Sequence, residues 1–357
     1  MVARLSFFVS VLLALRAYSS PSSPAAALAS QCSLSFSTTL PFPPAAVANA
    51  GTQSFIKSHW SLLNGGFEAG AANLAFVSDP FPNAPAPGCA PGSGPVLEVQ
   101  YNAGSYDLNT NGGAQFYSLW NTGKGAVQTM MVSYEVAFEN GFDWVKGGKL
   151  PGLRGGPDLK GCSGGRQSNG TNCFSSRLMW RTSGAGEVYD YVPRTGNNLC
   201  SSADVLCNEQ YGTSLNRGSF HFSPGQWHSV IMMVKLNSLP NVADGEVALY
   251  FDNTLVISRK DIQYRSGSMI TVGGLYFSTF YGGSDATWAT TSLTHSYFRN
   301  FELFADSSSS PSQPPPPSPP SSPSSSPSSP SSPSSSPSSS PSRSKHRHHK
   351  SKTHKGA

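Results

Sequence analysis

Five polar side chains near the middle of the sequence have the types needed to move a proton beside a carboxylate. The segment SSRLMWRT alternates polar and apolar residues, so a strand there would place Ser175 and Arg177 on one face. In GEVYDYVP the same two-residue period places Tyr189 and Tyr191 together. Lys149, in the glycine-rich segment KGGKLPG, can reach the same face from a loop. If the two strands pair through the turn TSGAG, one face gathers cations and hydroxyls.

These residue types suit an elimination next to a carboxylate. In a polymer of uronate sugars, a base removes the weakly acidic proton beside the carboxylate, and the glycosidic oxygen leaves across the neighbouring bond. Arg177 suits the carboxylate because its guanidinium fork can bind both oxygens. A tyrosine suits the base or the acid if Lys149 and Arg177 lower its pKa from about 10. The scheme requires no cofactor and no metal, and the sequence contains no metal-ligand spacing in this region.

Three further arginines are candidates for substrate subsites. They are Arg154, Arg181 and Arg194, which follow or flank the same segments. An outward arginine on a strand is ordinarily a solvated surface group. Each of the three can alternatively pair with Glu187 or Asp190, and the sequence leaves both readings open.

The strands that would hold these residues dominate the region from residue 31 to residue 306, which we expect to be one domain. Alternating or β-branched segments recur in PVLEVQY, AQFYSLW, VQTMMVSYEVAF, SSRLMWRT, GEVYDYV, WHSVIMMVKL, GEVALYFDN and GGLYFSTFYGG. Gly, Asn, Ser and Pro clusters separate them, and no amphipathic helix longer than a turn or two is expected. The pattern predicts an all-β fold, a jelly roll of two antiparallel sheets with a concave face that suits a long polymer.

The N-terminus and the cysteines indicate export. The segment MVARLSFFVSVLLAL has one arginine ahead of an apolar run and is typical of a secretory signal peptide, over residues 1–20 with cleavage as late as residue 30. The six cysteines all follow it, as expected in an oxidising compartment. Close spacing favours the pairs Cys162–Cys173 and Cys200–Cys207, and this leaves Cys32 with Cys89, although six cysteines permit 15 pairings and free buried thiols are the alternative. We therefore predict a secreted, extracellular protein with three disulfides.

Composition changes sharply after residue 306. Residues 307–342 are almost entirely serine and proline and should form an extended linker. Residues 343–357 contain six Arg or Lys residues and four histidines, so subtracting six from the net charge of +5 leaves −1 for the rest. The tail is therefore expected to bind an anionic wall or surface polymer, or simply to be solvated. We expect no nucleic-acid partner, no membrane span in the mature protein, and a monomer.

Three longer sequence runs, which include these residues, resemble the signature of a known protein family. The runs DWVKGGKLPGLRGG, CFSSRLMWR and GEVYDYVP resemble the signature of polysaccharide lyase family 14, the alginate and glucuronate-polymer lyases with a β-jelly-roll fold. The resemblance implies that Lys149, Ser175, Arg177, Tyr189 and Tyr191 are the catalytic residues, with a tyrosine or the lysine moving the proton.

One departure from the family pattern lies between Lys149 and Ser175. The loop there carries Cys162, Cys173 and the sequon NGT at Asn169. Asn169 is therefore a predicted glycosylation site, and a glycan on it could narrow the cleft and alter the preferred length of substrate.

The predicted function is a secreted lyase that cleaves an acidic, uronate polysaccharide such as alginate or polyglucuronate by β-elimination. The main alternative is a jelly-roll protein of the cell surface or wall that binds an acidic glycan without cutting it. Binding alone would keep Arg177 and Lys149 but would tolerate loss of the tyrosine hydroxyls. A purely structural wall protein would show neither cleavage nor saturable glycan binding.

Overall fold

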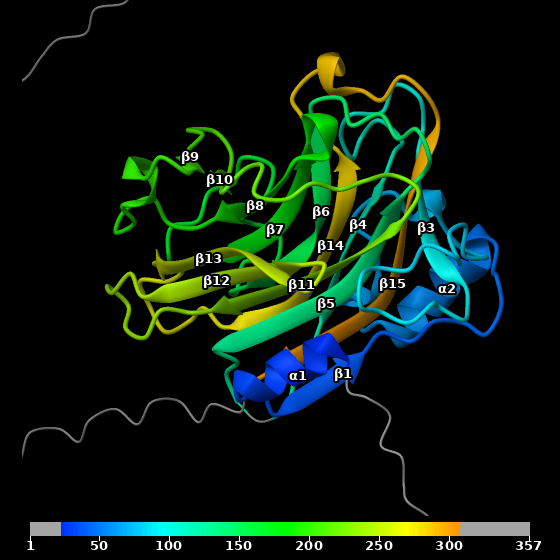
Figure 1. Cartoon of the computed structure of the whole chain (residues 1–357). Coiled ribbons are helices and arrows are strands. Elements are labelled where there is room, and N and C mark those ends of the chain that lie inside the picture. The colour runs from blue at the N-terminus through cyan, green and yellow to red at the C-terminus, as the bar shows by residue number, and fades with distance from the viewer. Residues whose placement is uncertain (1–22, 124, 307–357) are drawn as a thin grey trace, which may run out of the picture. The chain divides into compact units, whose positions relative to one another are not determined.

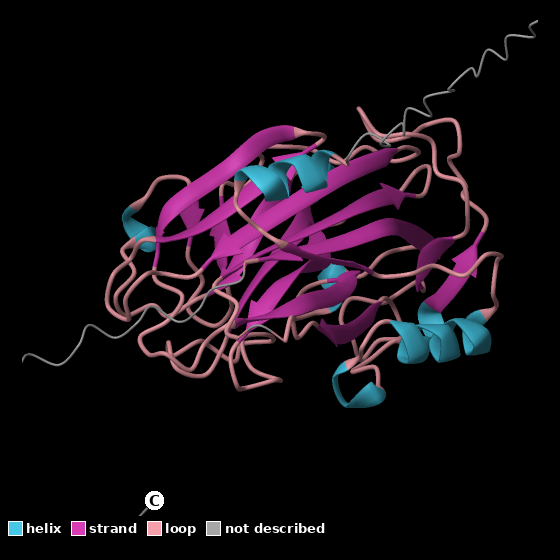
Figure 2. Cartoon of the chain, turned by 90° about the horizontal axis from the view of Figure 1, so that it is seen from below, coloured by secondary structure: helices cyan, strands magenta, loops and turns pink. Residues whose placement is uncertain are grey.

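The computed structural model describes residues 23–123 and 125–306, which form two antiparallel β-sheets packed face to face (Figure 1). The predicted all-β jelly roll is confirmed. Strands are the predominant secondary structure, and the helices are few and short (Figure 2). The predicted signal peptide of residues 1–20, the predicted Ser/Pro linker and the basic tail lie outside the described residues. None of the described helices is long and apolar enough to cross a membrane.

The larger sheet has eight strands. Its order is β13-β12-β11-β5-β15-β3-β2, and β1 pairs with the far end of β15. The strands are β1 (Phe36–Thr39), β2 (Leu74–Val77), β3 (Val96–Tyr101), β5 (Thr129–Phe138), β11 (Trp227–Lys235), β12 (Gly245–Phe251), β13 (Thr254–Ile262) and β15 (Thr294–Ala305).

The second sheet has seven strands in the order β4-β14-β6-β7-β8-β10-β9. They are β4 (Ala114–Leu119), β6 (Gly147–Gly155), β7 (Phe174–Arg181), β8 (Gly186–Tyr191), β9 (Val205–Leu206), β10 (Thr213–Leu215) and β14 (Val272–Tyr281). One face of this sheet packs against the larger sheet. Its other face carries the predicted catalytic residues of β6, β7 and β8.

The core lies between the two sheets and follows the strict alternation of side chains along each strand. On β7, Leu178 and Trp180 are fully buried in it, and Val188 joins them from β8. On β5, Val132 and Val136 fill it from the larger sheet. Because these residues point inward, their immediate neighbours in sequence on β7 and β8 must point to the outer face, as predicted.

Two features of the chain differ from the sequence prediction. The segment around Lys149 was expected to be a loop, but it is β6, a central strand. Pro151, which normally excludes a segment from a sheet interior, sits where the pairing with β7 shifts register between Leu150 and Gly152. The prediction of no long helix was wrong for α2 (Asn49–His59), which buries only Thr52 and Ile56 and so has little amphipathic signal.

A second helix, α1 (Pro24–Gln31), precedes the predicted start of the domain at residue 31. Its buried residues Ala25 and Ala29 pack on Met131 of β5 and Phe304 of β15, on the outer face of the larger sheet (Figure 1). The described structure therefore includes a helix before Gln31, within the range considered for signal cleavage.

Two of the three predicted disulfides are present. Cys162 pairs with Cys173, and Cys200 pairs with Cys207. The third prediction was wrong, because Cys32 and Cys89 are both free thiols.

The outer face of the larger sheet explains why the third pair does not form. Cys32 packs with the cluster at Met131, and Cys89 packs with the cluster at Ala137. Six residues of β5 separate the two clusters, or about 20 Å at the rise of a strand. A disulfide needs Cα atoms within about 7 Å.

Candidate active site

A cleft of about 710 Å³ opens on the outer face of the seven-stranded sheet. Strands β7 and β8 form its floor, with Arg177 opposite Tyr189 and Ser175 opposite Tyr191 in the pairing. The predicted residues that line the cleft are Lys149, Arg177, Arg181, Tyr189 and Tyr191. The structure therefore brings together four of the five predicted catalytic residues and one of the three predicted subsite arginines.

Arg177 is a buried cation whose hydrogen bonds are incomplete. Its side chain is 1% exposed, and Nη1 donates to Ser278 Oγ at 3.2 Å. The guanidinium lies 4.4 Å from the ring centre of Tyr276. Its Nε and Nη2 have no hydrogen-bond partner among the described residues. Unsatisfied buried donors are costly, so these two nitrogens mark a place where an anionic ligand would complete the site.

Lys149 lies next to Arg177 on the cleft floor. Its Nζ is 2.9 Å from Met179 Sδ and 4.2 Å from the ring centre of Tyr189, and no ion pair to it is present in residues 23–123 and 125–306. Burial holds the pKa of Lys149 well below its usual value, and the nearby charges of Arg177 and Arg181 lower it further. A lysine in this setting is suited to be a neutral amine, and therefore a base.

The two tyrosines differ from the expectation. Burial raises the pKa of Tyr189 and of Tyr191, and this outweighs the lowering by Arg177 in both cases. The prediction that the cations pull a tyrosine pKa down was therefore wrong for the protein without substrate, because the side chains are buried too deeply. Burial thus favours the protonated form of both hydroxyls, which suits a tyrosine to donate a proton.

The tyrosine hydroxyls also differ from each other. Tyr191 Oη accepts a hydrogen bond from the backbone N–H of Gly165 at 3.2 Å. Tyr189 lines the cleft and its hydroxyl has no hydrogen-bond partner in the described part of the chain. The free hydroxyl is therefore the one on Tyr189.

Ser175 anchors a loop and does not line the cleft. Its Oγ donates to the carbonyl of Cys162 at 2.7 Å, and the residue is 1% exposed. The loop closed by Cys162–Cys173 forms one wall of the cleft through Ser163 and Gly164. The predicted glycosylation site, Asn169, is exposed on this loop.

The three predicted subsite arginines have different surroundings. Arg154 is buried, donates to the carbonyl of Asp158 at 2.7 Å and lines a separate pocket of about 260 Å³. Arg194 donates to the carbonyl of Asn208 and does not line the cleft. Arg181 lines the cleft and forms an ion pair with Glu187 at 2.5 Å, which was the alternative that the sequence left open.

The structure adds one charged residue that the sequence did not indicate. Arg217 lines the cleft and its Nε contacts Glu187 Oε2 at 2.6 Å. It follows the short strand β10 in a turn, where no alternating pattern predicts the direction of a side chain. Glu187 itself is fully buried and also accepts a hydrogen bond from Ser214 Oγ at 2.6 Å.

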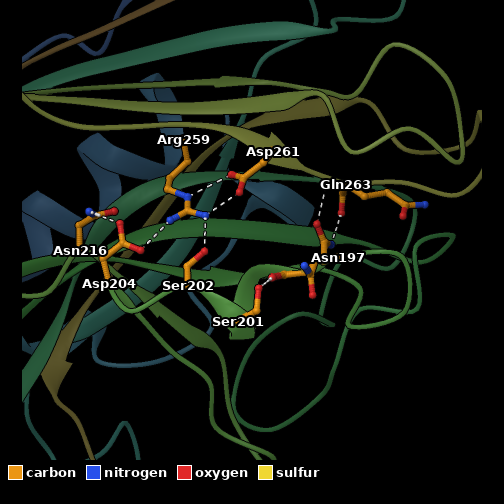
Figure 3. A network of polar contacts seen from close by, with 9 residues as sticks. Asn197, Ser201, Ser202, Asp204, Asn216, Arg259, Asp261 and Gln263 are labelled. Atoms are coloured by element: carbon orange, nitrogen blue, oxygen red, sulfur yellow. Dashed lines mark hydrogen bonds and ion pairs between the residues drawn. The ribbon is translucent and has the colours of Figure 1, made fainter.

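Another part of the cleft wall is formed at the end of the Cys200–Cys207 loop, where Leu206, Cys207 and the following Asn208 line the cleft. Figure 3 shows how this loop is tied to the edge of the larger sheet. Arg259 on β13 donates to Asp204 Oδ1 at 2.9 Å and to Asp261 Oδ2 at 2.6 Å. The wall is therefore held both by a disulfide and by a charged contact.

The sequence profile of the polysaccharide lyase 14 family matches residues 90–301, and the chain belongs to this family. It is therefore a lyase. A comparison with curated protein sequences finds no match.

Solved structures give the same result. A marine PL-14 alginate lyase from Aplysia kurodai is 30% identical over 75% of this chain and 99% of its own, with a TM-score of 0.63. The alginate lyase Aly36B is 19% identical over 75% and 96%, with a TM-score of 0.53. The alginate lyase vAL-1 from Chlorella virus is 21% identical over 63% and 90%, with a TM-score of 0.51. The latter two share the fold.

Proposed function

We propose that this protein is an exported lyase that cleaves a uronate polysaccharide by β-elimination. The observation that carries the proposal is that one cleft contains both Arg177 and Lys149. Arg177 has two buried hydrogen-bond donors without partners, and burial favours the neutral amine of Lys149. The first can bind a carboxylate and the second can remove a proton beside it. A glycan-binding protein without activity has no use for a lysine whose charge is suppressed.

The bond changes of the proposed reaction follow from the site. Arg177 binds the two carboxylate oxygens of one sugar and stabilises the negative charge that develops there when the neighbouring carbon loses its proton. Lys149 takes this proton. The electron pair forms a carbon–carbon double bond, the bond to the glycosidic oxygen breaks, and that oxygen takes a proton from a tyrosine. Return of the proton from Lys149 to the tyrosine restores both groups.

Tyr189 is the better candidate for the acid. Its ring centre is 4.2 Å from Lys149 Nζ, so the two side chains are neighbours, and its hydroxyl is free. Tyr191 is held by Gly165, and its role is to fix the wall of the cleft. Burial keeps the hydroxyl of Tyr189 protonated until an oxyanion develops beside it.

Alginate is the substrate that the comparisons favour, because the relative from Aplysia kurodai at 30% identity is called an alginate lyase. Polyglucuronate satisfies the same charge requirements and is the second candidate. The two free thiols do not weaken the proposal of export, since the signal-like N-terminus and two disulfides support it. We also propose that residues 343–357 bind an anionic polymer.

The test is incubation of the purified protein with polymannuronate, polyguluronate and polyglucuronate in separate assays. The ultraviolet absorbance of the new double bond is followed in each. A rise with one polymer supports β-elimination and names the substrate. No rise with any of them, together with saturable binding to one, would favour the glycan-binding alternative.

A further inference from the structure

Glu187 and its partners form a charged cluster next to the proposed reaction centre. Glu187 has no exposed surface and lies opposite Met179 in the pairing of β8 with β7. Arg181 donates to its Oε1 from Nε at 2.8 Å and from Nη2 at 2.5 Å, and Ser214 donates to its Oε2 at 2.6 Å. Arg217 donates to the same Oε2 from Nε at 2.6 Å.

The charge of this cluster is not balanced. Arg181 alone neutralises Glu187, and its two hydrogen bonds with that of Ser214 already engage both carboxylate oxygens. Arg217 therefore adds an excess positive charge. A positive charge that is not neutralised within the protein can attract an anionic group of a ligand.

The geometry of Arg217 leaves its terminal nitrogens available. It uses only Nε on Glu187, and its two Nη atoms have no partner among the residues that the structure describes. Its side chain is 39% exposed and lines the cleft. Glu187 thus orients the guanidinium while leaving the end that is suited to a carboxylate facing the cleft.

The position of the cluster matches a neighbouring sugar. Arg177 and Met179 lie on the same face of β7, two residues apart, and Glu187 pairs with Met179. One such step along a strand is about 7 Å, a separation on the scale of one sugar unit. A carboxylate at Arg217 would therefore belong to a sugar adjacent to the one held by Arg177.

We propose that Arg217, oriented by Glu187, binds the carboxylate of the adjoining sugar, so that the enzyme requires uronates in succession. This inference rests on the proposed function and adds the substrate class. Polymers that carry a carboxylate on every sugar are substrates, and polymers in which uronates alternate with neutral sugars are poor ones. Arg217 is a specificity-determining residue that takes no part in proton transfer.

The test compares Arg217→Gln, Arg217→Lys and the control Lys260→Gln with the wild type. Lys260 is an exposed cation on β13 of the other sheet, so its loss removes the same charge away from the cleft. Each protein is assayed on the uronate homopolymer that the wild type cleaves, intact and after a measured fraction of its carboxyl groups has been reduced to alcohols at random.

We expect Arg217→Gln to lower kcat/KM on the intact polymer by about tenfold or more, the effect of one charge-assisted hydrogen bond, mainly through KM. Arg217→Lys should recover part of the loss, and Lys260→Gln should behave as the wild type. On reduced polymers, wild-type kcat/KM should fall as the square of the remaining carboxyl fraction, because two neighbours must both be charged. For Arg217→Gln it should fall in simple proportion.

Two results separate the failure of this inference from that of the proposed function. An active wild type whose Arg217→Gln variant keeps its kcat/KM, or loses activity with the same dependence on carboxyl fraction as the wild type, overturns the role of Arg217 alone. A wild type that produces no double bond from any uronate homopolymer overturns the proposed function, and this inference with it. A lower melting temperature with an unchanged ratio of activities on the two polymers would assign Arg217 a structural role.

Discussion

Replacing Arg177 by methionine should make the protein more stable and nearly inactive. Two buried guanidinium nitrogens lack partners, and each unsatisfied donor costs about 1–3 kcal/mol. The substitution also removes one hydrogen bond to Ser278, worth about 1 kcal/mol, and the contact with the ring of Tyr276, worth up to about 2 kcal/mol when desolvated. The balance is a net gain of about 1–2 kcal/mol, in the range found when buried charges are replaced by apolar groups of similar volume.

The expected rise in Tm is about 2–8 °C for a domain of this size. Calorimetry gives the Tm, and the double-bond assay should show a loss in kcat/KM of about 10²–10⁴-fold, the value of two charge-assisted hydrogen bonds. Arg181→Met is the matched control. Arg181 pairs with buried Glu187, so its loss should lower the Tm. A lower Tm in Arg177→Met would refute the reasoning, because it would make Arg177 a structural residue whose donors are satisfied.

Three other predictions follow from the same face of the sheet. Tyr189→Phe should lower kcat by about 10²–10⁴-fold with little change in oligosaccharide binding, and Tyr191→Phe should cost less; equal losses would contradict the assignment of the acid. Burial raises the pKa of Asp190 from 3.8 to about 7, so its contribution to stability is present below about pH 4 and lost as the pH rises through 7. Asp190→Asn should therefore raise the Tm at pH 8 more than at pH 5, and a gain independent of pH would contradict this. Replacing Cys162 and Cys173 by serine should cost about 3 kcal/mol by chemical denaturation, and no loss would mean that the loop is held by its other contacts.

Much of the site could be predicted because successive side chains of a strand point to opposite faces of the sheet. A shift by one residue in β7 would have exchanged Arg177 for Leu178 on the outer face, and the apolar character of Leu178 and Trp180 excludes that register. The same reasoning fixed the positions of Tyr189 and Tyr191. Where the sequence alternates, it determines which side chains share a face.

The sequence was less informative where the backbone is irregular. Lys149 lies on a strand that contains Pro151 and four glycines, and only the register shift beside Pro151 makes this compatible with a sheet. Arg217 lies in a turn whose side-chain directions depend on the tertiary structure. Cys32 was assigned to Cys89 by elimination, and elimination carries no information about distance.

The pKa values show a different limit, because burial contributes more to them than the neighbouring charges do. The cations around Tyr189 were identified correctly, yet burial raises its pKa more than they lower it. The same burial lowers the pKa of Lys149, so it moves both groups toward their neutral forms. A neutral amine can accept a proton, and a neutral phenol beside it can donate one. The depth of the cleft floor, which no local pattern encodes, is therefore the reason for our proposal that the lysine and not a tyrosine abstracts the proton.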